Sequence, residues 1–212
     1  MKKNIYPDIE QLHDPGKYRL IKTLNHSEVV QFVVQQLNHL RWPVLLFYIF
    51  TAGLLSLIMT LSIYNYFNQI ITWGTWSLYL LFGILAGMIV VIPFHEGLHG
   101  LAYRLAGAKK VKYGMDLKQM LFYASAPGFV ANKKAFLIVA LAPFLIINLC
   151  FSAGIVFGPP PVKWASLVAL FVHSTMCIGD FAMANFFAAY TGKEVYTYDE
   201  EKSQTSYFYI ET

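Results

Sequence analysis

One short stretch of the sequence has the residue types and spacing of a metal site, His95-Glu96-Gly97-Leu98-His99. Side chains four positions apart stack on one face of an α-helix, so both imidazoles of this H-E-x-x-H pattern can bind a single metal ion. Zinc bound in this way lowers the pKa of a water ligand to about 7 and polarises a carbonyl group. Glu96 lies beside the two histidines, where it can accept a proton from that water. The pattern therefore predicts metal-assisted hydrolysis with Glu96 as the general base.

A catalytic zinc site usually has three protein ligands and a water, so a third ligand must come from elsewhere in the chain. Within the apolar stretches, the ionisable residues outside the motif are His173 and Asp180. Asp180 is the one carboxylate there besides Glu96, and both lie a few helical turns before the polar end of their stretch. Gly179 precedes it and would let two helices approach closely. We therefore expect Asp180 to be the third ligand.

His173 and Asn148 are further candidates for contact with a substrate. His173 lies seven residues before Asp180, nearly on the same helix face and about 10 Å along the axis. Either side chain would suit a substrate carbonyl or an oxyanion. The alternative for both is structural, namely a buried histidine with satisfied hydrogen bonds and an asparagine that joins two helices. Pro93 and Pro143 are expected to kink their helices, and a kink at Pro93 would open a path for water to the metal.

The composition decides which elements carry these residues. The chain has 212 residues, of which 57% are hydrophobic and 13% charged, against about 25% charged in a typical soluble domain. A soluble protein of this size cannot hide so much apolar surface. These proportions exclude a disordered chain, a coiled coil and a disulfide-stapled scaffold. They predict an all-α integral membrane protein that forms a single membrane-embedded domain over residues 1–212.

Charge-free stretches predict four transmembrane helices. No Asp, Glu, Lys or Arg occurs between Arg41 and Glu96, a stretch long enough to cross the hydrocarbon core twice. Another charge-free stretch ends in Gly158 and three prolines, which cannot continue a helix. The predicted spans are 44–64, 76–101, 135–157 and 164–187.

Positive charge sets the expected orientation, because short cytoplasmic connections are rich in Lys and Arg. The segment before the first span has six, among them Lys2 and Lys3, and the connection between the second and third spans has seven, among them Lys118. The other two connections have none and one. We expect the termini (1–43 and 191–212) to be cytoplasmic, and no nucleic-acid partner for the net charge of +4. The lack of sorting signals favours a bacterial plasma membrane.

Two segments outside the spans have recognisable patterns. Residues Ser27–Leu40 form an amphipathic pattern with Ser27 as the expected N-cap. This helix either lies in the cytoplasmic interface or packs against the bundle. Residues Val111–Phe129 contain glycine and proline among aromatic residues and are too short and broken to span. A hairpin or a re-entrant loop is expected there.

The remaining expectations concern residues without a predicted role in chemistry. Cys150 and Cys177 lie in apolar stretches without the spacing of a pair, so both are expected to be free and buried. The acidic segment Asp199–Glu201 is expected to be a solvated end.

The stretch Phe94-His95-Glu96-Gly97-Leu98-His99-Gly100, near the cytoplasmic end of a predicted transmembrane helix, resembles the site-2 protease clan of intramembrane zinc metalloproteases. The chain is also similar to a small bacterial family of zincin peptidases, over about residues 91–190. In that family the motif helix is followed by a basic, glycine-containing segment, an Ala-Pro pair and a Gly-Asp pair. The corresponding segments here are 106–114, Ala142-Pro143 and Gly179-Asp180.

The resemblance implies that His95, His99 and Asp180 bind zinc and that Glu96 is the general base. One departure concerns the aspartate, which site-2 proteases usually place before a glycine. In this sequence the glycine precedes Asp180. There is also no room in the sequence for the PDZ-like or CBS-like regulatory domain that many site-2 proteases carry.

The leading hypothesis is a membrane-embedded zinc endopeptidase that cleaves a transmembrane or juxtamembrane segment of another protein near the cytoplasmic face. The segment 111–129 would then offer a strand edge to an unwound substrate. One alternative is a metal-binding membrane protein without proteolytic activity, either a pseudo-protease or an accessory subunit. A second alternative is a zinc hydrolase that acts on a small amphiphile. A non-metal alternative treats His95, His99 and Glu96 as a buried polar network between helices.

Overall fold

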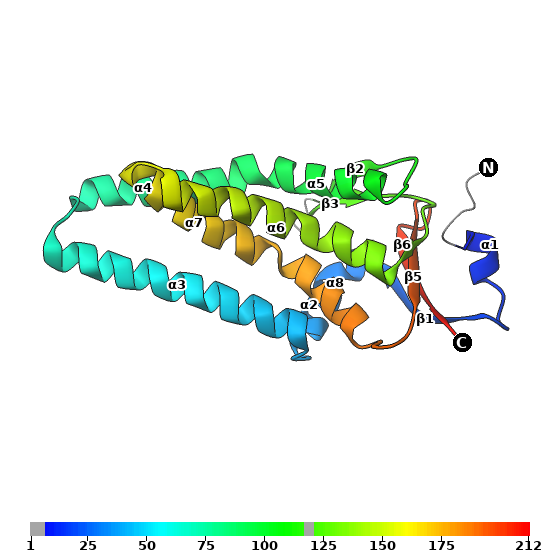
Figure 1. The fold of residues 1–212 in the computed structure, drawn as a ribbon. Coiled ribbons are helices and arrows are strands. Elements are labelled where there is room, and N and C mark those ends of the chain that lie inside the picture. The colour runs from blue at the N-terminus through cyan, green and yellow to red at the C-terminus, as the bar shows by residue number, and fades with distance from the viewer. Residues whose placement is uncertain (1–6, 117–120) are drawn as a thin grey trace.

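The computed structural model describes residues 7–116 and 121–212. Long helices form a bundle with a β-sheet at one end, and α1 and the C-terminus lie at that same end (Figure 1). Lys2, Lys3 and Lys118, which entered the charge counts, lie outside the described residues. The helices are α1 (Ile9–Leu12), α2 (Val29–Leu37), α3 (Trp42–Asn68), α4 (Trp73–Leu85), α5 (Val91–Leu105), α6 (Lys133–Phe157), α7 (Pro160–Met176) and α8 (Ile178–Ala188).

Three helices are long and apolar enough to cross a membrane: α3, α6, and the continuous helix 73–105 that contains α4 and α5. Their most apolar windows have mean hydropathies of 2.3 to 2.4, yet at most 33% of any window is buried inside the protein. Large apolar side chains such as Ile49, Phe67 and Leu149 are exposed on the bundle. Lipid is the solvent that such a surface requires. The chain is therefore an integral membrane protein, as its composition predicts.

The fourth predicted span corresponds to α7 and α8, which are bent by 47° relative to each other. The bend lies at Cys177, which ends α7 and precedes α8. If the pair is one span, the described residues contain four spans, and otherwise three. Because of the bend, Asp180 lies in the first turn of α8, where the helix dipole favours a negative charge.

A π-helical turn, Ala86–Val90 (η2), joins α4 to α5. Pro93 has no backbone N–H, so the carbonyl of Ile89 loses its usual helical partner just where this wide turn lies. The helix 73–105 continues through Pro93, where a kink was expected. Its irregular part is the π-helical turn, about one turn before the H-E-x-x-H motif. Gly83 in α4 and Gly87 in η2 allow close packing on α7, because a Cβ added at either residue would lie within 3.0 Å of α7 atoms.

The described residues also contain six strands in two sheets, so the expectation of an all-α fold is wrong. The larger sheet is antiparallel in the order β1-β6-β5-β4. Its strands are β1 (Tyr18–Asn25), β4 (Ala131–Asn132), β5 (Val195–Glu200) and β6 (Thr205–Glu211). Aromatic and β-branched residues in β5 and β6 favour this conformation, and Val195 and Phe208 are fully buried. In the segment Asp199–Glu201, Glu200 and Glu201 are exposed, as expected, but the segment is not a chain end, because it completes β5 and begins the turn to β6.

The smaller sheet is a hairpin of β2 (Lys112–Asp116) and β3 (Leu121–Ser125), in the segment where a hairpin or re-entrant loop was expected. Residues 117–120, between the two strands, lie outside the described residues. Lys112 and Lys110 at the base of the hairpin form ion pairs with Glu201, which follows β5. These contacts join the hairpin to the larger sheet.

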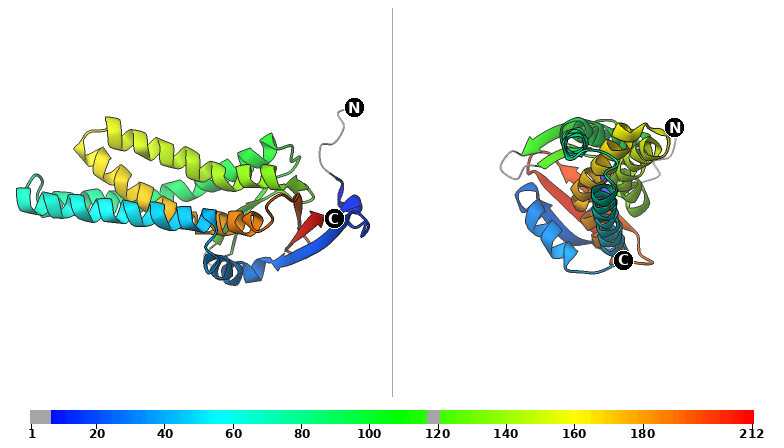
Figure 2. Two further views of the ribbon diagram at one scale, coloured as in Figure 1. Left: turned by 60° about the horizontal axis from the view of Figure 1, so that its bottom comes forward. Right: turned by 90° about the vertical axis from the view of Figure 1, so that its left-hand side faces the viewer.

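The predicted amphipathic helix is present as a short 3₁₀ turn, η1 (His26–Glu28), followed by α2. Ser27 is not its cap, because the Asn25 side chain accepts a hydrogen bond from the Ser27 N–H at 2.9 Å. Phe32 is buried among aromatic residues of α8 and β6, which are Phe186, Phe187 and Phe208. On the other side of α2, Val30 and Val34 are exposed. Figure 2 shows α2 at the junction of the bundle and the sheet. The buried face of α2 therefore agrees with the alternative in which this helix packs against the bundle.

The two cysteines differ in burial. Cys177 is buried, as expected, but Cys150 is exposed on α6. Helices that face lipid are apolar on every side, so the sequence around Cys150 does not reveal which face is outward. Both cysteines are free.

Candidate metal centre

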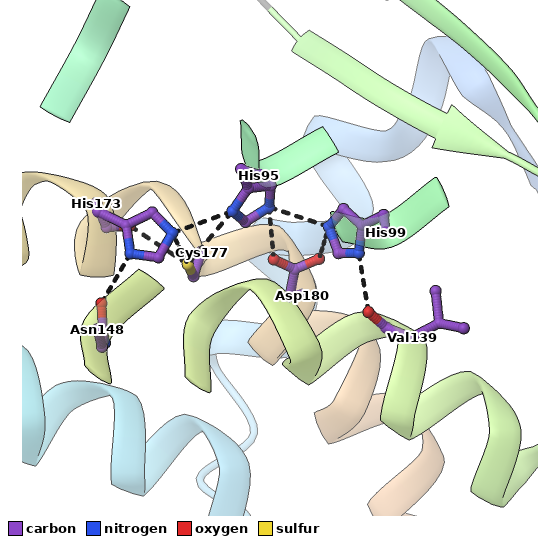
Figure 3. Close-up of polar contacts among 7 residues, drawn as sticks. All are labelled: His95, His99, Val139, Asn148, His173, Cys177 and Asp180. Atoms are coloured by element: carbon purple, nitrogen blue, oxygen red, sulfur yellow. Dashed lines mark hydrogen bonds and ion pairs between the residues drawn. The ribbon is translucent and has the colours of Figure 1, made fainter. Parts of the chain in front are cut away.

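The three predicted ligands meet where α5 lies against the start of α8. The Nε2 atoms of His95 and His99, one turn apart on α5, are 3.0 Å from each other. Asp180 lies with Oδ2 at 3.3 Å from Nε2 of His95 and Oδ1 at 3.3 Å from Nε2 of His99. Figure 3 shows the carboxylate of Asp180 between the two imidazoles. The structure thus brings together three side chains that are up to 85 positions apart, since 180 − 95 = 85.

These atoms have the chemistry and separations that zinc requires. Ligand atoms of a tetrahedral zinc at about 2.0–2.1 Å lie about 3.3–3.4 Å from one another. The separations of 3.0, 3.3 and 3.3 Å are close to this value. Two imidazole nitrogens and one carboxylate oxygen form a common donor set of catalytic zinc sites. The residues present therefore fit a zinc ion.

The orientation of His99 is set by α6. Its Nδ1 lies 2.9 Å from the carbonyl oxygen of Val139. A carbonyl oxygen only accepts hydrogen bonds, so a neutral His99 has its hydrogen on Nδ1 and its lone pair on Nε2. That lone pair points toward His95 and Asp180. A metal ion or an additional proton at this point would balance the repulsion between that lone pair and the carboxylate of Asp180.

Glu96 is not part of this cluster. Its Oε2 is buried and has no hydrogen-bond partner among the described residues. The backbone N–H of Ala124 in β3 donates a hydrogen bond to the same carboxylate. A buried carboxylate oxygen without a partner is costly unless water or a ligand completes it. The non-metal alternative, in which Glu96 pairs with the two histidines, does not describe this geometry, because their carboxylate partner is Asp180.

Glu96 and the three clustered side chains, His95, His99 and Asp180, lie on the wall of a cavity of about 1040 Å³. The cavity is also lined by the apolar face of α2, by β3 and by part of the larger sheet; examples are Val29, Val33, Phe122, Ala124 and Phe208. Ligand pockets usually have volumes of about 300–1,000 Å³. This cavity is at the upper end of that range, so it has room for an extended peptide segment or an acyl chain.

His173 and Asn148 lie behind His95 and are not among the described residues that line the cavity. His173 Nε2 is 3.1 Å from His95 Nδ1, and His173 Nδ1 is 2.8 Å from Asn148 Oδ1. Cys177, which the sequence analysis treated as a small apolar residue, lies with Sγ 3.5 Å from His173 Nε2. Its position one turn after His173 was the available signal, because it places the thiol on the histidine's face of the helix.

Sequence reasoning also missed Asp199, a carboxylate of β5 on the cavity wall. Ser206 donates a hydrogen bond to its Oδ1 at 2.7 Å. Burial raises the pKa of Asp199 above its usual value, against the hydrogen bonds from Ser206 and from the backbone of Ala126, which lower it. The alternation of large and polar residues over 195–200 was the signal for a strand.

Comparison with known proteins adds one match. A family model described as "Putative zincin peptidase" matches residues 88–193. The matched segment begins in the π-helical turn before α5 and ends after α8, so it includes the H-E-x-x-H motif, the hairpin and Asp180. No curated protein and no solved structure matches the chain.

Proposed function

This chain belongs to the zincin peptidase family, and from that premise we propose that it is an intramembrane zinc metalloprotease. It cleaves transmembrane or juxtamembrane segments of other proteins near the cytoplasmic face of a bacterial plasma membrane. His95, His99 and Asp180 hold the zinc, and Glu96 is the catalytic base. The proposed relationship is to the site-2 protease clan, in which the same motif lies on a transmembrane helix.

One observation carries this proposal. His95, His99 and Asp180 converge on one wall of a cavity. The same wall carries Glu96, whose buried Oε2 has no hydrogen-bond partner in the part of the chain that the structure describes. A purely structural ion-pair cluster gives no reason to bury Oε2 of Glu96 without a partner, because an unpaired buried carboxylate oxygen costs free energy. A hydrolase needs such an oxygen for the proton of the attacking water.

In the proposed mechanism, the chain's own residues position and move the protons. A zinc ion held by the three ligands supplies Lewis-acid polarisation of the scissile carbonyl and acidifies water. Glu96 accepts the proton of the attacking water at Oε2 and then delivers it to the leaving amine nitrogen. The Ala124 N–H holds the other part of this carboxylate, so that Oε2 stays directed into the cavity.

The position of the hairpin is an argument for a peptide substrate. A β3 backbone group already reaches Glu96, through Ala124. N–H groups of alternate residues point to the same edge of a strand, so Phe122 presents its N–H on that edge as well. A locally unwound substrate that adds to this edge as a strand would lie beside Glu96, with its carbonyls in reach of the metal ligands.

The distribution of positive charge supports the proposed cytoplasmic location of the site. Figure 1 shows β2 and β3, α1, β1, β5 and β6 at the sheet end of the bundle. The described residues of these segments and their flanks include basic residues such as Lys17, Lys112 and Lys193. Positive charge favours the cytoplasmic side of short connections. His99 lies six residues before the end of α5 at this same end, since 105 − 99 = 6, or about 9 Å along the helix axis.

The test is a comparison of wild type with Glu96→Gln in cells that express each at equal levels. Newly exposed N-termini of membrane proteins are identified by mass spectrometry, and zinc content is measured on each purified protein. We expect cleavage products in wild type alone, with zinc in both. Cleavage by Glu96→Gln at the wild-type rate would overturn the mechanism. Equal sets of N-termini in cells with wild type and cells with Glu96→Gln would favour the non-proteolytic alternative.

A second candidate function, hydrolysis of a small amphiphile, is favoured by the largely apolar cavity wall that α2 and the sheet contribute. An acyl chain would occupy this volume without any need for the strand edge of β3. Purified protein incubated with a lipid extract separates the two functions. Zinc-dependent release of a lipid fragment by wild type and not by Glu96→Gln would replace the peptide substrate by an amphiphile.

A further inference from the structure

We propose that His173, Asn148 and Ser174 are positioning residues for the metal site. They form a chain of hydrogen bonds behind His95 that determines which ring nitrogen of His95 is free to bind the metal. This inference rests on the proposed zinc site and assigns to His173 and Asn148 a role other than contact with the substrate.

The contacts run in one unbroken series from His95 on α5 to Leu170 on α7. Figure 3 shows its first part, from His95 through His173 to Asn148. His95 Nδ1 lies 3.1 Å from His173 Nε2, and His173 Nδ1 lies 2.8 Å from Asn148 Oδ1. Asn148 Nδ2 then lies 3.1 Å from Ser174 Oγ, and Ser174 Oγ lies 2.6 Å from the carbonyl oxygen of Leu170. His173 and Ser174 are at most 1% exposed.

The last group in the series gives every hydrogen bond its direction. The Leu170 carbonyl only accepts, so the single hydroxyl hydrogen of Ser174 is donated to it. Ser174 Oγ therefore accepts from the Asn148 NH₂ group, which leaves Asn148 Oδ1 as the acceptor for His173. A buried neutral histidine that donates from Nδ1 has a lone pair on Nε2.

That lone pair is the acceptor for His95. Nδ1 of His95 must then carry the hydrogen, and Nε2 keeps its lone pair on the side of His99 and Asp180. With the opposite direction, His95 would have its hydrogen on Nε2, where it would block the metal. This series of hydrogen bonds thus excludes the tautomer of His95 that cannot bind the metal.

The two histidine ligands reach the same outcome by different routes. His99 donates from Nδ1 to a backbone carbonyl directly, at Val139. His95 has only side chains behind it, and its route to a backbone carbonyl passes through three of them before it ends at Leu170. Partners of this kind orient metal-binding histidines and raise their basicity.

A second metal is the competing explanation, because Cys177 also approaches this pair. Its Sγ is 3.5 Å from His173 Nε2 and 4.0 Å from His95 Nδ1. However, Cys177 already has a hydrogen-bond acceptor in the His173 carbonyl, at 3.3 Å. The cavity reaches His95 without reaching His173 or Cys177, which leaves a proton as the simpler bridge between the two imidazoles.

The experiment measures zinc affinity of detergent-purified protein by competition with a chelator, without reference to proteolysis. His173→Phe and Asn148→Leu break the chain, and we expect each to weaken zinc binding by about ten- to hundredfold. Asn148→Asp keeps an acceptor for His173, so it should bind zinc much more tightly than Asn148→Leu. A role in packing alone would predict the reverse order, because Asp would add a buried charge.

Ser174→Ala is a smaller change for the case in which a larger one prevents folding, and it should weaken zinc binding in the same direction. Its matched control is Ser166→Ala, a buried serine on the same helix that is not part of the chain. Folding of each metal-free variant is checked by thermal unfolding. Wild-type affinity in His173→Phe and Asn148→Leu, or equal weakening in Ser166→Ala, would overturn the inference.

Three outcomes separate this inference from a second metal site and from the proposed function. A second equivalent of zinc that disappears in Cys177→Ser would overturn the inference in favour of a second metal site. Wild-type protein that binds no zinc would overturn the proposed function and this inference together. Zinc in wild type with unchanged affinity in the chain variants would overturn the inference alone.

Discussion

Nδ1 of His99 lies 2.9 Å from the carbonyl oxygen of Val139, a contact that ties the motif helix α5 to α6. The backbone of one helix therefore orients a side chain of another, and Nε2 of His99 is directed at Asp180 on α8. Three helices thus meet at a single imidazole. Loss of any one of the converging groups should be measured most directly as loss of the metal.

We predict that His99→Ala and Asp180→Ala each abolish stoichiometric zinc binding. Removal of a direct ligand should cost more than the about ten- to hundredfold loss typical of residues that only support ligands. Zinc is measured by mass spectrometry on detergent-purified protein supplied with the metal. His39→Ala is the control, because it removes an exposed histidine outside the cluster.

The pattern of losses separates the hypotheses. Zinc lost in His99→Ala but retained in Asp180→Ala would keep a metalloenzyme and remove Asp180 from its ligands. Wild-type protein without zinc after exposure to the metal would favour a structural cluster in which Asp180 and the histidines form ion pairs.

The sequence could identify the three side chains that the structure brings together, because their signals are local or arise by elimination. His95 and His99 are identified by a spacing of four on a helix. Asp180 is identified because charged residues are nearly absent from the apolar stretches, and a lone carboxylate there needs a reason. The hairpin is similarly local, since its two strands lie next to each other in the chain.

The four-stranded sheet is not local, and for that reason it was missed. Its edge strand β1 pairs with β6, so that Tyr18 faces Glu211 although the two residues are almost the whole length of the chain apart. Charged residues, such as Arg19 and Lys22 in β1 and Glu211 in β6, are typical of solvent-exposed chain ends and concealed the pairing of these two strands. The role of Asn148 behind a ligand was hidden in a similar way, because side-chain direction on an all-apolar helix has no sequence signal.

Close packing of α4 on α7 predicts opposite effects for two glycines of the apolar helices. An added Cβ at Gly83 would lie 2.6 Å from the carbonyl oxygen of Ala165 and 2.7 Å from Cβ of Val168. Neither atom is the flexible end of a side chain, so Gly83→Ala should destabilise the protein by about 1–3 kcal/mol. The comparison is the midpoint of thermal unfolding in detergent.

Gly53 is the matched control on α3, where an added Cβ meets no atom within 4 Å. Alanine forms helices better than glycine by about 1 kcal/mol, so Gly53→Ala should leave stability unchanged or raise it slightly. Equal destabilisation by both substitutions would contradict the packing argument.

Cysteine accessibility tests the proposed orientation. In a Cys150→Ser background, Ile70→Cys between α3 and α4 should react with a membrane-impermeant maleimide added to intact cells. Lys193→Cys after α8 should react only after the membrane is permeabilised, because the sheet end is cytoplasmic in the proposal. The reverse pattern would place the metal site near the outer face.

Asp199 makes stability depend on pH with a defined sign. Burial raises its pKa in the folded protein above the usual aspartate value of 3.8, so the folded state binds more protons than the unfolded state between these two values. The contribution of Asp199 to stability is therefore most favourable below the unfolded pKa and is lost as pH rises through the folded pKa.

Asp199→Asn removes this dependence while it keeps an oxygen for the Ser206 hydroxyl. The stability of the variant relative to wild type should increase from acidic to neutral pH in unfolding experiments, whereas Asp14→Asn, which removes an exposed carboxylate, should show no such rise. A relative stability of Asp199→Asn that falls over this interval would show that the charged carboxylate is favoured at this position.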